Sequence, residues 1–139
     1  MTVPALSSLL VGTADARRLR AWYVAALAPG DAGDGVVEVT PTMFACTFGS
    51  TTLLIDGRGD VADKNGEPNR LILNFVVDDI AVVEARLVAM EAVWVREVER
   101  TPWGMIGTVL DVDGNYVQII EPAPGTVPWC AKGGEEEGV

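Results

Sequence analysis

The sequence predicts an α+β fold built from two successive βαβββ modules, and three observations lead to it. Each half of the chain reads as a strand, a helix and three strands, in that order. The two halves overlay with a shift of 64 residues (79 − 15), which places Asp15 on Asp79 ahead of the two predicted helices. Asp113-Gly114 lies between two apolar runs near the end and is typical of a hairpin turn.

The first module is predicted over residues 6–57. An apolar run at 6–13 indicates a strand, and Asp15 or Thr13 can cap the helix ARRLRAWYVAALA that follows it. Pro29-Gly30 ends this helix. Three short strands complete the module, and we expect them at 36–40, 43–48 and 51–56.

Residues 58–69 are rich in Gly and charge, with few apolar side chains, and are predicted to form a linker or mobile loop. The second module is predicted over 70–122. It begins with the strand RLILNFVVD and the helix IAVVEARLVAMEA, capped by Asp78 or Asp79. Its last three strands are expected at 93–99, 105–111 and 116–122. Residues 123–139 lack periodicity, and we expect a mobile acidic tail there.

Charge and hydropathy restrict the partners of this chain. Its formal net charge of −10 repels phosphate backbones, so we expect no nucleic-acid binding. No apolar run is long enough to cross a bilayer, and the first residues lack the basic region of a signal peptide. We therefore expect a cytoplasmic protein with no membrane partner. In that compartment Cys46 and Cys130 are expected to be reduced thiols.

The chain contains no histidine. This excludes His-dependent catalytic triads and most zinc sites, and it removes the commonest general base. The sequence also lacks a Gly-rich phosphate loop, a nucleophile elbow and a CxxC motif. An enzyme built from this chain would therefore depend on carboxylate, Tyr, Lys, Arg or Cys side chains.

The closing segment DVDGNYVQIIEP, residues 111–122, resembles the closing strands of the glyoxalase/bleomycin-resistance/dioxygenase proteins, the vicinal oxygen chelate superfamily. The duplicated element order extends this resemblance over about residues 6–122. The resemblance implies two modules related by pseudo-twofold symmetry, which form a curved mixed sheet around a cleft. It also implies a homodimer, since family members usually pair and exposed strand edges need covering.

In the metalloenzymes of this family, the metal ligands come from the first and last strands of each module. The resemblance places these four positions at Ser8, Leu53, Ile72 and Gln118. The last two strands are aligned with a shift of 65, which matches Gly49 to Gly114. A tight divalent site needs carboxylates, imidazoles or thiolates, and these positions offer only a hydroxyl and a neutral amide. We expect no metal and no other cofactor.

Strand alternation predicts which side chains line the cleft. The predicted ligand-binding residues are Ser8, Leu53, Ile72, Asn74, Trp103, Tyr116 and Gln118. A mostly apolar surface with a few polar groups is typical of a small-molecule site. A collapsed core in which Gln118 finds a backbone partner has the same composition, so the sequence leaves both interpretations open. Trp103 either stacks on a planar ligand or covers the end of the sheet.

The sequence is compatible with three functions of different classes. The first is a metal-independent binding protein that holds a small apolar or aromatic molecule without turnover, as metal-free resistance proteins of this family do. The second is a metal-independent lyase or isomerase that uses Tyr116, Glu38 or Cys46 as an acid–base group. The third is a dimeric structural or partner-binding module. The sequence favours the binding protein and identifies no catalytic residue.

Overall fold

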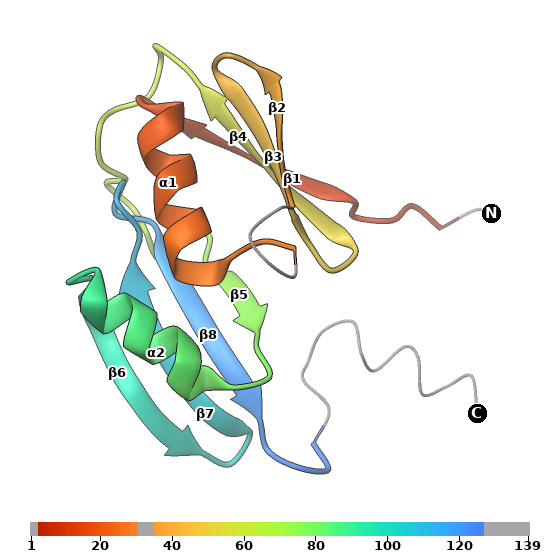
Figure 1. Cartoon of the computed structure of the whole chain (residues 1–139), viewed down its shortest axis with the longest axis vertical. Coiled ribbons are helices and arrows are strands. Elements are labelled where there is room, and N and C mark those ends of the chain that lie inside the picture. The colour runs from red at the N-terminus through yellow and green to blue at the C-terminus, as the bar shows by residue number, and fades with distance from the viewer. Residues whose placement is uncertain (1–2, 31–34, 127–139) are drawn as a thin grey trace. The chain divides into compact units, whose positions relative to one another are not determined.

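The computed structural model describes residues 3–30 and 35–126, and each half of the chain has the βαβββ order (Figure 1). The predicted α+β fold of two such modules is confirmed. The chain divides into two compact units. Of the described residues, the first unit contains 3–30, 35–67 and 111–115, and the second contains 68–110 and 116–126.

The first unit holds a four-stranded sheet in the order β1-β4-β3-β2. Its elements are β1 (Ser8–Thr13), α1 (Ala16–Leu27), β2 (Val36–Thr40), β3 (Met43–Phe48) and β4 (Thr51–Gly57). β1 runs parallel to β4, while the other two pairs are antiparallel. α1 packs against β3 and β4, so one face of the sheet forms the core of this unit.

The sequence accounts for the start and the buried face of α1. Asp15 caps the helix, because its carboxylate accepts a hydrogen bond from the Arg18 backbone N–H at 3.1 Å. The buried stripe at helical spacing is Ala16, Leu19, Tyr23 and Ala26. On β3, the Phe44 ring lies beneath the guanidinium of Arg20 at 5.0 Å, which marks the strand face that α1 covers.

The second unit repeats this arrangement with a sheet in the order β5-β8-β7-β6. Its elements are β5 (Leu73–Val76), α2 (Ile80–Ala89), β6 (Val93–Thr101), β7 (Gly104–Leu110) and β8 (Tyr116–Pro122). Asp79 caps α2 by accepting from the Ala81 N–H at 3.1 Å. The Ile80 N–H donates to Glu121 Oε1 at 2.8 Å, so Glu121 lies on the helix side of β8. No helix within 3–30 or 35–126 has the length and apolar character needed to cross a bilayer.

The strand pairing shows that the repeat keeps a shift of 64 residues into its closing strand. Leu10 pairs with Leu54, and Asn74 pairs with Gln118. Both parallel pairs therefore have an offset of 44 residues (54 − 10 and 118 − 74). The shift of 65 expected for the closing strands is wrong, because Gln118 corresponds to Leu54 and not to Leu53.

The cause of this error is the length of one hairpin loop. The pairs Thr47–Thr52 and Leu110–Tyr116 hold equivalent places in the two sheets, and they enclose four and five residues (48–51 and 111–115). Aligning Gly49 with Gly114 counts the extra loop residue as part of the closing strand, so that strand is aligned one residue out of register. A slip of one residue exchanges the two faces of a strand.

The segment expected to be a linker is hydrogen-bonded to the first unit. The Arg58 N–H donates to Thr13 O at 2.8 Å, and the Asn65 N–H donates to Asp113 O at 2.8 Å. The Arg58 guanidinium also binds Asp56 at 3.1 Å and Asp60 at 2.8 Å. Residues 58–67 consequently belong to the first unit.

The acidic tail predicted at 123–139 is described only at its beginning. The Ala123 N–H donates to Trp103 O at 2.9 Å, and the Thr126 N–H donates to Ala123 O at 3.0 Å. These bonds hold the first tail residues beside the end of β8. Residues 127–139, with Cys130 among them, lie outside the described part of the chain.

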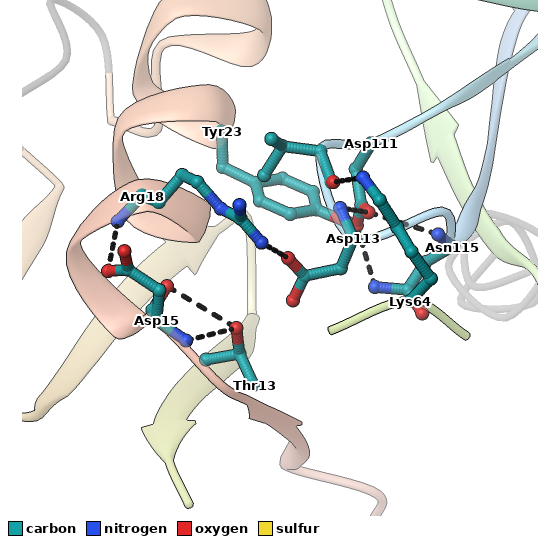
Figure 2. Close-up of polar contacts among 9 residues, drawn as sticks. Thr13, Asp15, Arg18, Tyr23, Lys64, Asp111, Asp113 and Asn115 are labelled. Atoms are coloured by element: carbon teal, nitrogen blue, oxygen red, sulfur yellow. Dashed lines mark hydrogen bonds and ion pairs between the residues drawn. The ribbon is translucent and has the colours of Figure 1, made fainter. Parts of the chain in front are cut away.

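The loop at 111–115 is held by a buried tyrosine of α1 (Figure 2). Tyr23, which is fully buried, donates from its hydroxyl to Asp111 Oδ2 at 2.7 Å. The Asp111 carboxylate also accepts from the Asp113 N–H at 2.8 Å, the Asn115 N–H at 3.0 Å and the Asn115 Nδ2 at 2.8 Å. Four donors thus converge on one carboxylate, which fixes the path of the loop.

Three further contacts hold the outside of this loop, and Figure 2 shows those of Arg18 and Lys64. Arg18 donates to Asp113 Oδ1 at 3.1 Å, and Lys64 donates to the Val112 carbonyl at 2.6 Å. Asn65 Nδ2 donates to Asn115 Oδ1 at 2.9 Å. Gly114 adopts φ +82, a conformation that favours glycine in such a turn. The polar residues of DVDGN are therefore used to build the loop.

Replacing Tyr23 by Phe should lower the free energy of unfolding by about 1–3 kcal/mol, because Asp111 loses a buried donor. Burial, followed by the charge of Asp111, raises the pKa of Tyr23 well above its ordinary value of 10.0. The folded state therefore keeps this proton longer than the unfolded state, and stability falls as the pH rises past 10. Urea unfolding at neutral and alkaline pH measures both effects.

Tyr116→Phe is the matched control for this experiment. It removes the other tyrosine hydroxyl of the chain and should leave the alkaline loss of stability in place. Tyr23→Phe should remove the tyrosine part of that loss. A Tyr23→Phe variant as stable as the wild type at neutral pH would show that the Asp111 contact contributes nothing.

Candidate functional site

The predicted ligand-binding residues were assigned by strand alternation, so their positions depend on which face of each sheet they occupy. We call the face of a sheet opposite its own helix the far face. Register partners on neighbouring strands share a face, which allows each side chain to be assigned. The two sheets are considered separately below.

In the first sheet, Ser8 and Leu53 lie on opposite faces. Leu53 pairs with Leu9 on β1 and with Cys46 on β3, and it is 3% exposed on the face that α1 covers. Ser8 is one residue from Leu9 and lies on the far face. The prediction that Ser8 and Leu53 line one surface is therefore wrong, and Leu54 occupies the far-face position.

A row of apolar side chains crosses the far face of the first sheet. Each is the register partner of the next, in the order Leu10, Leu54, Ala45 and Val37. The two outer members are largely exposed, Leu10 at 52% and Val37 at 61%. This apolar row contains no hydrogen-bonding side chain.

The equivalent row of the second sheet is polar. Its members pair in the order Asn74, Gln118, Thr108 and Arg96, across all four strands. Thr108 is 7% exposed, Gln118 is half-buried, and the two outer members are exposed. We call this set the polar row. It brings together two of the predicted site residues, Asn74 and Gln118.

Thr108 and Arg96 were not among the predicted site residues. Their place depends on the register of β7 against β8 and on two irregularities in the pairing of β6. Thr108 is two residues from Ile106 and two from Leu110, so strand alternation places all three on one face. This spacing was the signal available in the sequence. It identifies a polar residue on one strand face but does not say which residue lies beside it.

Two other predicted residues lie close to the polar row. Tyr116 precedes Gln118 by two residues on the same face of β8, pairs with Leu110 and is half-buried. Ile72 comes just before β5, two residues from Asn74, and is 36% exposed. An apolar and an aromatic side chain thus flank the amides in the second unit.

Trp103 lies at the far end of β7 from these residues. It lies five positions before Thr108 in the chain, which corresponds to roughly 17 Å along an extended strand. Its turn is fixed by Gly104, where φ is +137 and a Cβ would come within 2.1 Å of the Glu121 carbonyl. The structure therefore does not bring Trp103 beside Gln118, and its indole is 57% exposed.

The amides of the polar row have no protein partner in the part of the chain that the structure describes. The side chains of Asn74, Gln118 and Thr108 make no hydrogen bond to other described residues. Arg96 is different, because its guanidinium binds Glu99. Of the two interpretations of Gln118, a core amide satisfied by a backbone group does not fit this geometry.

The candidate acid–base groups do not form a paired set. Glu38 is an exposed side chain on the edge strand β2, 4.0 Å from Arg17. Cys46 is buried beneath α1, and burial raises the pKa of its thiol, with the nearby Arg20 charge partly opposing this. A protonated, buried thiol is a poor nucleophile. Tyr116 lies in the second unit, on the same face as the polar row.

The side chains at the expected metal positions do not fit a divalent metal. Ser8 offers a hydroxyl, and Gln118 offers a neutral carbonyl. Ile72 offers no donor, and neither does Leu53 or Leu54, the far-face residue beside it. Among residues 3–30 and 35–126, no three His, Cys, Asp or Glu side chains are grouped so that they could hold a metal ion. Asp56, on the far face of the first sheet, is paired with Arg58.

Comparison with known families identifies the fold. Residues 8–120 match the model of the glyoxalase-like domain. The chain belongs to this family. The resemblance to the glyoxalase/bleomycin-resistance/dioxygenase proteins, the vicinal oxygen chelate superfamily, is thereby confirmed. No curated protein sequence matches the chain significantly.

Solved structures of similar fold include both binding proteins and enzymes. TnmS3, an antibiotic-binding protein from a Streptomyces species, has 21% identity and a TM-score of 0.67, with 88% of this chain and 99% of that chain covered. A glyoxalase/bleomycin resistance protein/dioxygenase family enzyme from Burkholderia phytofirmans has 16% identity and a TM-score of 0.67, with 86% and 100% covered. Lactoylglutathione lyase from Agrobacterium tumefaciens has 21% identity and a TM-score of 0.62, with 87% and 96% covered.

The glyoxalase-like domain purified without a metal-affinity tag should contain substoichiometric nickel, zinc, manganese and iron, because its donor set is too weak to retain them. Elemental analysis of dialysed protein measures this. One equivalent of metal that EDTA removes, together with a loss of ligand binding, would contradict the prediction.

Proposed function

We propose that this glyoxalase-like domain binds a small molecule with an apolar or aromatic body, without a metal and without turnover. The polar row of the second sheet takes the hydrogen-bonding groups of that molecule. One observation carries the proposal. Asn74 and Gln118 lie side by side in register on the far face, and neither has a protein partner among the described residues.

The surroundings of the polar row support this function. On one side Ile106 pairs with Ile120, and on the other Leu110 pairs with Tyr116. A few polar groups framed by apolar and aromatic side chains are typical of small-molecule sites, since the apolar area supplies affinity and the polar groups supply orientation. The Tyr116 ring, two residues from Gln118 on the same face of β8, is an aromatic surface on which a planar ligand can stack.

One of the similar structures also supports a binding function. TnmS3 has the same fold and is described as an antibiotic-binding protein. The lyase from Agrobacterium tumefaciens represents the enzymatic alternative on this fold. Within the described part of this chain no His, Cys, Asp and Glu side chains are grouped to hold a metal, and Tyr116, Glu38 and Cys46 do not pair with one another, which supports binding over turnover.

A metal-independent lyase or isomerase is the second candidate function. Tyr116 is the observation that favours it, because its hydroxyl is a possible proton donor on the same face as the polar row. Following a bound ligand by mass spectrometry separates the two functions. Binding predicts that the ligand is recovered unchanged, whereas turnover predicts a product that Tyr116→Phe suppresses.

Gln118→Leu should weaken a cognate ligand by about 1–3 kcal/mol, since the ligand group that met the amide is left unpaired. The substitution nearly preserves volume and gives the second sheet the residue that Leu54 provides in the first. The ligand is first found by a thermal-shift screen of aromatic natural products, and isothermal titration then measures its affinity for wild type and variant.

Two controls accompany this measurement. Asn69→Leu removes an exposed amide of the same unit outside the sheet and should leave the affinity unchanged. Trp103→Ala should weaken only ligands long enough to reach the end of β7. A loss of melting temperature in Gln118→Leu with unchanged affinity would count against a role for this amide in binding.

We also propose that the chain forms a homodimer, with β2 as the paired edge. β6 is poorly suited because it carries four charged side chains and two pairing irregularities, which disfavour edge contacts. β2 carries one charged side chain, Glu38, and one irregularity beside the exposed Val37 and Val39. Light scattering should report about twice the chain mass of 14.7 kDa. A monomer at high micromolar concentration would rule the dimer out.

A further inference from the structure

We infer that the group recognised by the polar row is an uncharged amide-type group, such as a carboxamide, lactam or imide, rather than a carboxylate or phosphate. The inference rests on the proposed binding function and specifies the class of ligand. It follows from the chemistry of the row, from its charge balance and from the charge of the whole chain.

The two amides of the row offer both kinds of hydrogen-bonding group. β5 and β8 are neighbouring parallel strands, so the Asn74 and Gln118 backbones lie about 4.8 Å apart. Each side chain ends in a carbonyl acceptor and an NH₂ donor. A ligand amide presents the complementary acceptor and donor on one planar group, and it can satisfy both side chains together.

An anion satisfies only half of this capacity. A carboxylate or phosphate accepts hydrogen bonds, so it can use the NH₂ groups but leaves the Asn74 and Gln118 carbonyls without a donor. Gln118 is half-buried, so a carbonyl that is left unpaired there on binding reduces the affinity. Thr108 continues the row with a hydroxyl that can donate or accept, so it is compatible with either ligand and does not offset this difference.

The charge balance of the far face also disfavours an anion. Among the described residues that register places on this face of the second sheet, the charged side chains are Arg96 and Glu99. They bind each other, so the only cation of the row is already neutralised. The chain as a whole carries a formal net charge of −10, which repels anionic ligands at longer range.

A cationic ligand is disfavoured because the carboxylate of this face is already paired. A cationic ligand needs a carboxylate that can accept a hydrogen bond from it. Glu99 is the carboxylate that strand register places on this face. Its oxygen already accepts from Arg96. The row therefore favours a neutral group that both donates and accepts.

The test uses two probes with the same aromatic body, 2-naphthamide and 2-naphthoate. Gln118 is the only glutamine of the chain, so its side-chain NH₂ resonances in an ¹⁵N–¹H spectrum are assigned by their loss in Gln118→Leu. The inference predicts that 2-naphthamide moves these resonances and binds about tenfold or more tightly than 2-naphthoate. Equal or tighter binding of 2-naphthoate overturns the inference.

Glu99→Gln tests the charge argument separately. This substitution frees the Arg96 guanidinium without changing the shape of residue 99, so the preference for 2-naphthamide over 2-naphthoate should fall several-fold. An unchanged preference overturns the argument that the Arg96–Glu99 pair excludes anions. Wild-type protein in high salt is the parallel control, because salt also screens the net charge.

The outcomes distinguish the inference from the proposed function. If the Gln118 resonances respond to a ligand from the natural-product screen but to neither naphthalene probe, the inference is overturned and the binding function stands. If they respond to no ligand that stabilises the protein, the proposed function is overturned along with it.

Discussion

The Tyr23–Asp111 hydrogen bond holds the loop that precedes β8, and the position of Gln118 depends on this loop. Asp111 follows β7 directly, and its carboxylate takes the Tyr23 hydroxyl together with backbone and side-chain donors of the loop. The loop consequently has a fixed path of five residues before β8 begins at Tyr116. Because side chains alternate along a strand, the length of this loop decides which face Gln118 occupies.

The two modules keep the same backbone register and use it for different chemistry. Leu54 and Gln118 have the same place in their sheets, beside Leu10 and Asn74. One row is entirely apolar and the other is entirely polar, although β1 pairs with β4 in the same register as β5 pairs with β8. Since backbone hydrogen bonds build the sheets, far-face side chains can change without loss of the fold.

This difference between the modules bears on the proposed binding function. The expected ligand positions offer only the Ser8 hydroxyl in the first module and the neutral Gln118 amide in the second. The same loss leaves amides that face no protein partner among the described residues. Such groups are useful to a binding protein, because a ligand that pairs with them is distinguished from one that does not.

The sequence by itself determined the order of elements, the caps at Asp15 and Asp79 and the family, because helical periodicity, capping side chains and hairpin turns are local signals. It also placed Asn74, Tyr116 and Gln118 on one face. It failed at Leu53, since a one-residue difference in loop length is invisible until the pairing of Leu54 is known. Only the tertiary structure could place Thr108 beside Gln118 and Arg96 beside Thr108, and attach residues 58–67 to the first unit. These contacts join residues far apart in the chain, and their register is set by pairing and packing rather than by local sequence.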